Sequence, residues 1–422
     1  MEWGVKVVVK DDISIIELFM GALYSLMFNH RAVLPIYSAF HIRHSMSVSR
    51  VLILGGYGNF GKRIAASLCV MSNATVIIAG RNLKKAQQLC LELSNTAGGN
   101  APEAAMLDIF SLQFVEELKA LAPDLVIHTG GPFQGQDYRV PEACITVGSH
   151  YIDLADDRRF VCDIRALNEL ALSKQVLIIS GASSVPGLSS VVIDHLTDQF
   201  SALHEIDCAI APGNQAERGE ATVKGILSYT GHAFPVFING QWTQRYGWMS
   251  PRKLNFAGSI GKRWLANVNI PDLELFPARY AQVKTVTFQA GLELPFLHLG
   301  MVGMAKLAKM GVIKDWSVFT KPIFKASELF DKLGTDNGGM QIKLLGLDVN
   351  QRPTLIKWTL FAEQGVGPYI PTLSAIILAK KLINKELSAT GAMPCLGMFS
   401  LAEFDQEASE LGIYHQLEVM DV

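Results

Sequence analysis

Charged residues are scarce in this chain of 422 residues, at 18% of the total, and they nearly balance to a net charge of -2. A chain with no basic excess gives no support for nucleic-acid binding, which usually shows a basic patch. The mean hydropathy of +0.24 is apolar for a soluble protein of average composition. This apolar surplus indicates a large core, a buried oligomer interface or membrane contact, and composition does not choose among them.

Cysteine is also sparse, and its spacing contains no CxxC pair and no Cys/His cluster. The six cysteines are Cys69, Cys90, Cys144, Cys162, Cys208 and Cys395. This spacing argues against a disulfide framework and against a zinc site, so no metal is expected. The pattern predicts reduced, mostly buried thiols in a cytoplasmic protein. The chain shows no internal repeat or low-complexity linker, and its length suits two or three domains.

No apolar run near the N-terminus is long enough for a confident membrane span, since Ile13–Phe28 is short and carries Glu17. No basic region precedes this run and no small-residue cleavage site follows it, which argues against a signal peptide. Residues 46–50 lead directly into an apolar strand. We therefore expect Met46 to be the native start and residues 1–48 to be an extension. The competing interpretation is an amphipathic membrane anchor.

A glycine-rich turn follows the strand Val51–Leu54 and precedes a helical pattern from about Asn59 to Met71. Gly56 would allow the tight turn, Gly58 the approach of a pyrophosphate, and Gly61 close packing of helix on strand. The anion would then lie on free N–H groups of the helix N-terminus. The predicted binding residues are Gly56, Tyr57, Gly58, Asn59, Phe60 and Gly61. The alternative is a Rossmann turn that binds nothing.

The residue after the second strand predicts which dinucleotide is used. An NAD site carries an acidic residue about twenty positions after the glycines, but Arg81 stands there, after the strand Ala74–Ala79. A guanidinium can bind the 2′-phosphate of NADP through paired hydrogen bonds, so NADP is the expected cofactor. The alternative is that Arg81, with Lys84 and Lys85, forms a solvated helix start.

Two further strand ends supply candidate cofactor contacts. Asp108 could accept from the adenine amino group, or it could cap a helix that begins near Ser111. The fourth strand, Asp124–Thr129, opens into a Gly-Gly-Pro-Phe turn that should lie beside the nicotinamide. The predicted contacts there are Thr129, Gly130, Gly131, Pro132 and Phe133.

Strand and helix patterns alternate from residue 50 to about 180, which predicts a parallel sheet with crossover helices. Several motifs of this stretch resemble the saccharopine dehydrogenase-like (saccharopine reductase type) NADP-binding oxidoreductase family. They are Gly-Gly-Tyr-Gly-Asn-Phe-Gly at 55–61, Gly-Pro-Phe at 131–133, Gly-Ser-His-Tyr-Ile-Asp at 148–153 and Gly-Ala-Ser-Ser-Val-Pro-Gly at 181–187. The resemblance spans roughly residues 49 to 412. It implies an α/β fold, with a Rossmann doubly wound parallel sheet and an inserted α/β substrate domain.

The expected domains follow from this resemblance. They are 1–48, an extension; 49–186, the dinucleotide-binding domain; 187–366, a substrate and dimerisation domain; and 367–422, a segment that returns to the first domain. Alternation in Gly339–Leu345 and Thr354–Phe361 predicts an antiparallel hairpin. Residues 238–280 are expected to form loops over a cleft. The apolar stretch Leu294–Met310 predicts a core or homodimer-interface helix, and a membrane-surface helix is the less favoured alternative.

Candidates for proton transfer or substrate binding are Asp153 and Asp156, near the carboxyl edge of the sheet, and Arg218, which could hold a substrate carboxylate. The ordinary alternatives are a structural role for Asp153, as partner of a backbone N–H, and a surface position for Arg218. The sequence lacks a Ser-x-x-x-Tyr-x-x-x-Lys set of the short-chain reductase kind.

Three functions remain open. The resemblance implies an NADP-dependent oxidoreductase that moves hydride to or from a C=N or C=O carbon of a small amino-acid-derived molecule. The apolar composition favours a membrane-associated reductase of a lipid-like enone or ketone. The missing catalytic set would suit an NADP-binding protein without turnover.

Overall fold

The computed structural model describes residues 48–95 and 98–421. The predictions made for the N-terminal extension lie outside these residues. No helix in the described part of the chain is long and apolar enough to cross a membrane.

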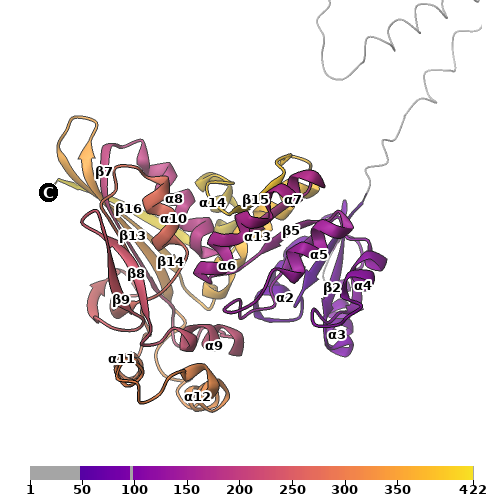
Figure 1. Cartoon of the computed structure of the whole chain (residues 1–422), viewed down its shortest axis with the longest axis horizontal. Coiled ribbons are helices and arrows are strands. Elements are labelled where there is room, and N and C mark those ends of the chain that lie inside the picture. The colour runs from indigo at the N-terminus through magenta and orange to yellow at the C-terminus, as the bar shows by residue number, and fades with distance from the viewer. Residues whose placement is uncertain (1–47, 96–97, 422) are drawn as a thin grey trace, which may run out of the picture. The chain divides into compact units, whose positions relative to one another are not determined.

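Seven strands form a first, wholly parallel sheet (Figure 1). They are β1 (Ser49–Leu54), β2 (Ala74–Gly80), β3 (Glu103–Met106), β4 (Leu125–His128), β5 (His150–Asp153), β6 (Leu177–Ser180) and β15 (Gly391–Pro394). Their order is β15-β6-β5-β4-β1-β2-β3. The first six strands have the Rossmann order, whose direction reverses between β1 and β4 and leaves a ligand crevice there. The predicted doubly wound sheet is confirmed.

Helices cover both faces of this sheet. One face packs on α2 (Asn59–Leu68), α3 (Leu83–Ser94) and α13 (Ile370–Ile383); the other packs on α4 (Phe114–Leu121), α5 (Arg139–Val147) and α7 (Asn168–Ser173). Strand residues alternate between the two cores. Val51 and Ile53 lie in the first core and Leu52 and Leu54 in the second. This two-sided burial explains why the strand is a continuous apolar run.

A second sheet also has seven strands, in the order β10-β11-β12-β7-β13-β14-β16. They are β7 (Phe200–Ala211), β10 (Arg252–Asn255), β11 (Lys262–Asn267), β12 (Thr285–Ala290), β13 (Gly338–Asp348), β14 (Pro353–Ala362) and β16 (Tyr414–Asp421). β13 and β14 form the predicted antiparallel hairpin. The sheet as a whole is mixed, because β12 pairs with β7 in parallel.

Short elements connect and cover the two sheets. They are α6 (Arg158–Asp163), η2 (Ile164–Leu167), η3 (Ser184–Leu188), α8 (Ser189–Thr197), α9 (Glu220–Ser228), α10 (Asp272–Arg279), α11 (Pro295–Lys309), η4 (Trp316–Phe319), α12 (Thr320–Glu328), η5 (Gly367–Tyr369) and α14 (Leu401–Ser409). α9, α11 and α12 lie together at one end of the second sheet (Figure 1).

The prediction of loops over residues 238–280 is wrong. A hairpin of β8 (Ala233–Ile238) and β9 (Gln241–Tyr246) begins there, and β10, β11 and α10 follow. Alternation of large side chains carries the hairpin, since Phe237 and Trp242 face each other across it with ring centroids 5.2 Å apart.

The C-terminal segment contributes to both sheets. β15 pairs with β6 in the first sheet, whereas β16 pairs with β14 in the second. The prediction that this segment returns to the first domain therefore holds for α13 and β15, whereas β16 lies in the second sheet.

Candidate cofactor and substrate site

The glycine turn connects β1 to α2 by close backbone contacts. A Cβ on Gly61 would lie 2.4 Å from the carbonyl oxygen of Gly55, and a Cβ on Gly56 would lie 2.9 Å from that of Ile53. The positive φ of the turn, +82°, belongs to Gly55, so the tight-turn role predicted for Gly56 falls on its neighbour. A Cβ on Gly58 would meet only the Gly55 oxygen, at 3.0 Å.

These contacts leave an anion site at the start of α2. Gly58 is its N-cap and offers no side-chain acceptor. The first amides of the helix, including those of Asn59 and Phe60, have no acceptor within the helix. A cradle of side-chain-free positions facing free N–H groups fits a dinucleotide pyrophosphate.

A loop of the second sheet contacts the same helix. The Glu217 carboxylate accepts hydrogen bonds from Lys62 at 2.8 Å and from Arg63 at 2.9 Å, and its carbonyl accepts from Asn59 at 3.2 Å. Burial alone would raise the pKa of Glu217, but the hydrogen bonds from these two cations prevail and lower it. No motif indicates this connection, because the partners lie more than 150 positions apart in the sequence.

The end of β2 presents free positive charge. Arg81, Lys84 and Lys85 are exposed, and no side-chain partner is recorded for them within residues 48–95 and 98–421. Tyr57 folds over this strand end: its hydroxyl accepts a hydrogen bond from the Asn82 N–H at 2.9 Å. A solvent-facing guanidinium at this edge is available for a 2′-phosphate.

The predicted capping role of Asp108 is wrong. Its carboxylate accepts from the Phe110 N–H at 3.1 Å, in a local turn after β3. Helix α4 begins only at Phe114, with Gln113 at its N-cap. Asp108 is partly exposed at the sheet edge, and its contact with adenine stays a prediction.

The turn from Thr129 to Phe133 is fixed from both sides. The Thr129 hydroxyl lies 3.0 Å from the Leu54 carbonyl, to which it donates, so this turn is tied to the end of β1. The Gln136 amide donates to the carbonyls of Gly130 at 3.0 Å and Pro132 at 2.7 Å. A Cβ on Gly131 would make only ordinary contacts, so this backbone is open toward the crevice.

Phe133 is part of the core and does not line the crevice. It is buried, and its ring packs edge-on against His128, with centroids 5.1 Å apart. Burial lowers the pKa of His128 to about 3, so this imidazole is neutral. The buried rings of His128 and Phe133 therefore support the turn from the core side.

Asp153 holds the ends of two strands together. One carboxylate oxygen accepts from the N–H of Ala155 at 2.9 Å, the N–H of Gly181 at 2.8 Å and the Ser180 hydroxyl at 3.0 Å. Desolvation nevertheless raises the pKa of this buried carboxyl to about 6. These bonds favour the structural alternative for Asp153.

Asp156 lies at the same edge and is accessible to solvent. Its carboxylate accepts from the Gln134 amide at 3.1 Å, and desolvation by the surrounding protein raises its pKa. Gln134 touches α9, because a Cβ on Gly225 would lie 2.6 Å from the Gln134 oxygen. Asp156 is thus joined through one side chain to the helix that borders the substrate pocket.

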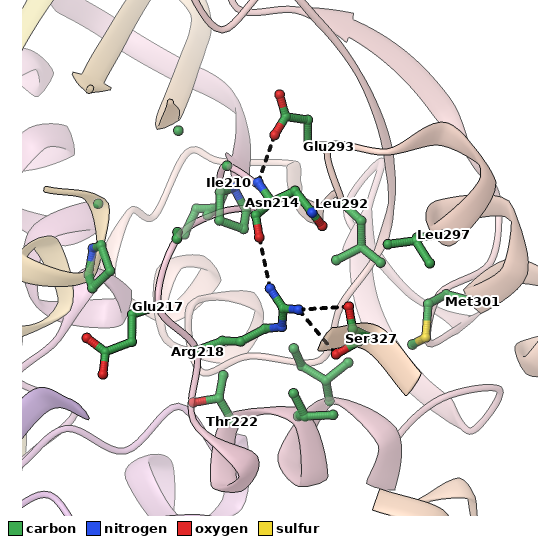
Figure 2. Close-up of a pocket in the computed structure, with 18 of the residues that line it drawn as sticks. Ile210, Asn214, Glu217, Arg218, Thr222, Leu292, Glu293, Leu297, Met301 and Ser327 are labelled. Carbon is green, nitrogen blue, oxygen red and sulfur yellow. Dashed lines mark hydrogen bonds between the residues drawn. The ribbon is translucent and has the colours of Figure 1, made fainter. Parts of the chain in front are cut away.

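A pocket of about 620 Å³ extends from the glycine turn into the second sheet's region (Figure 2). Asn59 and Phe60 stand at the cofactor end. The wall is mainly apolar and comes largely from β7, β13, α9, α11 and α12, with Ser184 of η3, Pro368 of η5 and Ile370 of α13 completing it. It includes Ile210, Val223, Ile226, Leu227, Trp248, Leu292, Phe296, Leu297, Met301, Met304, Ile323, Phe330 and Met340. The volume is within the range of small-molecule sites.

Arg218 lines this pocket but is already engaged (Figure 2). Its guanidinium donates to the Asn214 carbonyl at 2.8 Å and to the Ser327 hydroxyl at 3.2 Å, and it pairs with Asp331. Among the described lining residues Arg218 is the only cation. A substrate carboxylate would therefore have to displace Asp331.

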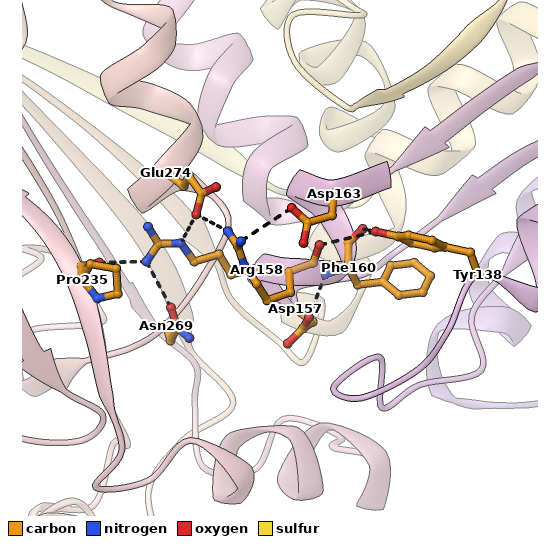
Figure 3. Close-up of polar contacts among 9 residues, drawn as sticks. Tyr138, Asp157, Arg158, Phe160, Asp163, Pro235, Asn269 and Glu274 are labelled. Carbon is orange, nitrogen blue, oxygen red and sulfur yellow. Dashed lines mark hydrogen bonds and ion pairs between the residues drawn. The ribbon is translucent and has the colours of Figure 1, made fainter. Parts of the chain in front are cut away.

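Arg158 joins the two regions at another point (Figure 3). It is buried, donates to Glu274 and to the Pro235 carbonyl, each at 2.8 Å, and approaches Asn269 at 3.5 Å. Glu274 also pairs with Arg159. Arg158 is a structural link, and the local sequence Asp-Asp-Arg-Arg does not distinguish this role from a site.

The six cysteines are all buried and unpaired, as predicted. No group of three or more His, Cys, Asp or Glu within the described ranges could hold a metal ion.

The fold and the glycine cradle define a dinucleotide-binding Rossmann domain joined to a second, mixed-sheet domain. The family model "Saccharopine dehydrogenase NADP binding domain" matches residues 51–179, so this part of the chain is similar to that domain. No curated protein matches the sequence.

A solved structure extends the likeness in fold beyond that domain. The apo histidine-tagged saccharopine dehydrogenase (L-Glu forming) from Saccharomyces cerevisiae is 13% identical, with a TM-score of 0.61 over 88% of this chain and 100% of that chain. The amine dehydrogenase from Mycobacterium smegmatis is 11% identical, with a TM-score of 0.42 over 84% and 96%. The first likeness shows that the two-domain fold is shared.

Proposed function

We propose that this protein is an NADP-dependent oxidoreductase whose substrate is a largely apolar molecule with a reducible C=O, C=N or conjugated C=C group. The observation that carries the proposal is the apolar pocket that begins at Asn59 and Phe60, beside the glycine cradle. Apolar walls bind apolar surface through the hydrophobic effect and would leave a charged substrate desolvated.

The chain's residues divide the work as follows. The N–H groups after Gly58 hold the pyrophosphate, Arg81 binds the 2′-phosphate, and the Thr129–Phe133 turn positions the nicotinamide. The cofactor, when bound, supplies or accepts hydride. Asp156 does not itself line the pocket, but it is the candidate proton donor, because its carboxyl is accessible, has a raised pKa and bonds to Gln134, which touches α9.

The small amino-acid-derived substrate implied by the resemblance is less well supported. It would need a cation for its carboxylate, and Arg218 is bonded to Asp331, Ser327 and Asn214. Homodimerisation and a cytoplasmic location stay predictions.

NADPH oxidation with a panel of substrates tests this proposal. We expect turnover of apolar ketones or enones, with kcat/KM rising up to about fourfold for each added methylene, from about 0.8 kcal/mol of burial each. Arg218→Met should change these values less than about threefold, since the pair with Asp331 is partly exposed.

Two outcomes would contradict the proposal. Turnover confined to carboxylate-bearing imines and abolished in Arg218→Met would restore the amino-acid substrate. NADPH binding without turnover of any ketone, enone or imine would favour a non-catalytic NADP-binding protein.

A further inference from the structure

One face of α11 is both apolar and exposed. Phe296, Leu299, Leu307 and Met310 recur at helical spacing, and each exposes between 39% and 73% of its surface. Gly303 lies on the same side, which is exposed along the helix. The opposite side is buried, as expected for a helix packed on a core. Exposed apolar stripes of this kind commonly mark interaction sites.

The segment that follows α11 also exposes large apolar side chains. Its large exposed side chains are Val312, Val318, Phe319, Leu329 and Leu333, of which Leu329 is the most exposed at 80%. Phe296 and Phe330 pack edge to face with centroids 5.2 Å apart, which joins the two ends of the segment. We call residues 294–334 the apolar face.

Exposed lysines are interspersed with these side chains along the sequence. The apolar face contains six lysines and three acidic residues, a net charge of +3 in a chain whose total is -2. The lysines are Lys306, Lys309, Lys314, Lys321, Lys325 and Lys332, and all are exposed. Two of the acids have internal partners, since Asp315 accepts from Ser317 and Asp331 pairs with Arg218. Within the described residues none of the six forms an ion pair, and Lys309 instead places its ammonium 4.0 Å from the centre of the Tyr246 ring.

The same helices line the apolar pocket on their inner side. Leu297, Met301 and Met304 of α11 and Ile323 of α12 face the pocket, whereas Leu299 and Leu307 do not line it. The pocket and the apolar face are therefore two sides of one helical layer, and Phe296 belongs to both.

We propose that the apolar face docks on the surface of an anionic lipid bilayer. The apolar side chains would enter the interface while the lysines bind anionic headgroups, as in interfacial amphipathic helices. This inference rests on the proposed function, because it supplies the route by which an apolar substrate passes from lipid into the pocket. α11 has 15 residues, about 22 Å at 1.5 Å per residue, which suits a helix lying on a bilayer better than one crossing it.

Charge favours a bilayer over a second copy of the chain. In a two-fold dimer the same patch meets itself. Such a contact would bring two lysine-rich surfaces together, and like charges facing each other oppose association.

Sedimentation of the full chain with vesicles tests the inference. We expect binding to vesicles of phosphatidylcholine mixed with phosphatidylglycerol, and much weaker binding to phosphatidylcholine alone. Lys306→Gln with Lys325→Gln should weaken binding about 30-fold, from about 1 kcal/mol per lysine. Leu299→Glu with Leu307→Glu should abolish it.

A matched control changes exposed apolar residues elsewhere. Leu112 and Val349 are both more exposed than Leu299 and Leu307, and Leu112→Glu with Val349→Glu should leave vesicle binding unchanged. Equal binding by the α11 double variant and the wild-type chain would overturn the inference and place lipid contact elsewhere. The inference would also be overturned if the wild-type chain were a dimer, the α11 double variant were a monomer, and neither protein bound vesicles.

Turnover in solution separates this inference from the proposed function. A short, water-soluble ketone or enone should be reduced equally by the wild-type chain and the α11 variant. Vesicle binding without turnover of any apolar compound would overturn the proposed substrate class and leave the docking surface standing. Turnover of apolar compounds without vesicle binding would overturn the docking surface and leave the proposed substrate class standing.

Discussion

The two regions of this protein bind through opposite chemistry. At the edge of the first sheet, backbone amides, glycines and free cations such as Arg81 form a polar cradle for a charged cofactor. In the second region, side chains from several elements form an apolar pocket whose one described cation is neutralised by Asp331. A cofactor common to many enzymes needs a fixed polar frame, whereas substrate preference depends on the shape and polarity of the adjoining wall.

The largest expected effect concerns the cradle. Gly58→Val should weaken NADPH binding by about 1000-fold, because the added side chain fills the place of the pyrophosphate. Thermal stability should fall only modestly, since a Cβ on Gly58 would lie 3.0 Å from one backbone oxygen, that of Gly55, which must move by a few tenths of an ångström. Calorimetric titration measures the affinity. Gly303→Val, at a glycine with open space around it, is the control, and unchanged affinity in Gly58→Val would remove the basis for the cofactor site.

The second prediction compares how a buried carboxyl in each region affects the pH dependence of stability. Asp272, at the start of α10, is buried with one hydrogen bond, from Ser189 at 2.6 Å, and desolvation raises its pKa from 3.8 to about 7. A carboxyl whose folded pKa is raised contributes stability below its unfolded pKa and loses it as pH rises through the folded value.

Asp272→Asn removes this loss. Relative to the wild-type chain, its free energy of unfolding should rise by about 4 kcal/mol between about pH 4 and pH 8, at about 1.4 kcal/mol for each unit of the pKa shift from 3.8 to about 7. Denaturant unfolding at several pH values measures this difference. Asp153→Asn is the counterpart in the first region. Its free energy of unfolding should rise less with pH, because the pKa of Asp153 is raised only to about 6. The rise should be offset by weaker hydrogen bonds from Ala155, Ser180 and Gly181 to the amide that replaces the carboxylate. A pH-independent difference for Asp272→Asn would show that this carboxyl does not titrate in the range.

The third prediction tests which cofactor the cradle selects. Arg81→Asp should weaken NADPH binding about 30-fold while NADH changes little, because a carboxylate repels the 2′-phosphate. Fluorescence titration with both nucleotides measures the ratio. Lys119→Asp, on α4, controls for the loss of a positive charge on this domain. Equal weakening of both nucleotides would show that Arg81 does not contact that phosphate.

The smallest effect should come from filling the pocket. Met304→Trp adds volume to the apolar wall and should raise KM for a long apolar substrate about tenfold, while the Kd of NADPH stays constant. Steady-state kinetics and cofactor titration together separate the two regions. A matching loss of NADPH affinity would mean that the pocket and the cradle are not independent.

The first region was largely predictable because its information is local. A doubly buried strand, three spaced glycines and a helix follow one another within residues 51–68. The strand His150–Asp153 likewise coincides with the strand predicted from the sequence. Local spacing failed on finer points. Gly55 rather than Gly56 takes the positive φ, and Asp108 caps no helix, because both depend on the detailed path of the turns.

The second region depends on contacts between distant residues. Arg218 meets Asp331 across 113 positions, and Lys62 meets Glu217 across 155. No motif marks these partners, so the sequence allowed Arg218 to be either a carboxylate ligand or a surface residue. The strands between residues 233 and 267 were missed because they are short and rich in charged and aromatic residues, and because β8 and β9 pair in a two-stranded sheet of their own.

Residue order along the chain was enough to specify a parallel nucleotide-binding sheet and the charge at the end of its second strand, because strand pattern, glycine spacing and the residue that follows are short-range features. The apolar pocket, the engagement of Arg218 and the exposed apolar face exist only once several separate elements pack together. Tertiary packing determines which side of each helix is exposed to solvent and which cation pairs with a carboxylate. The hydrophobic periodicity of a single helix predicts neither.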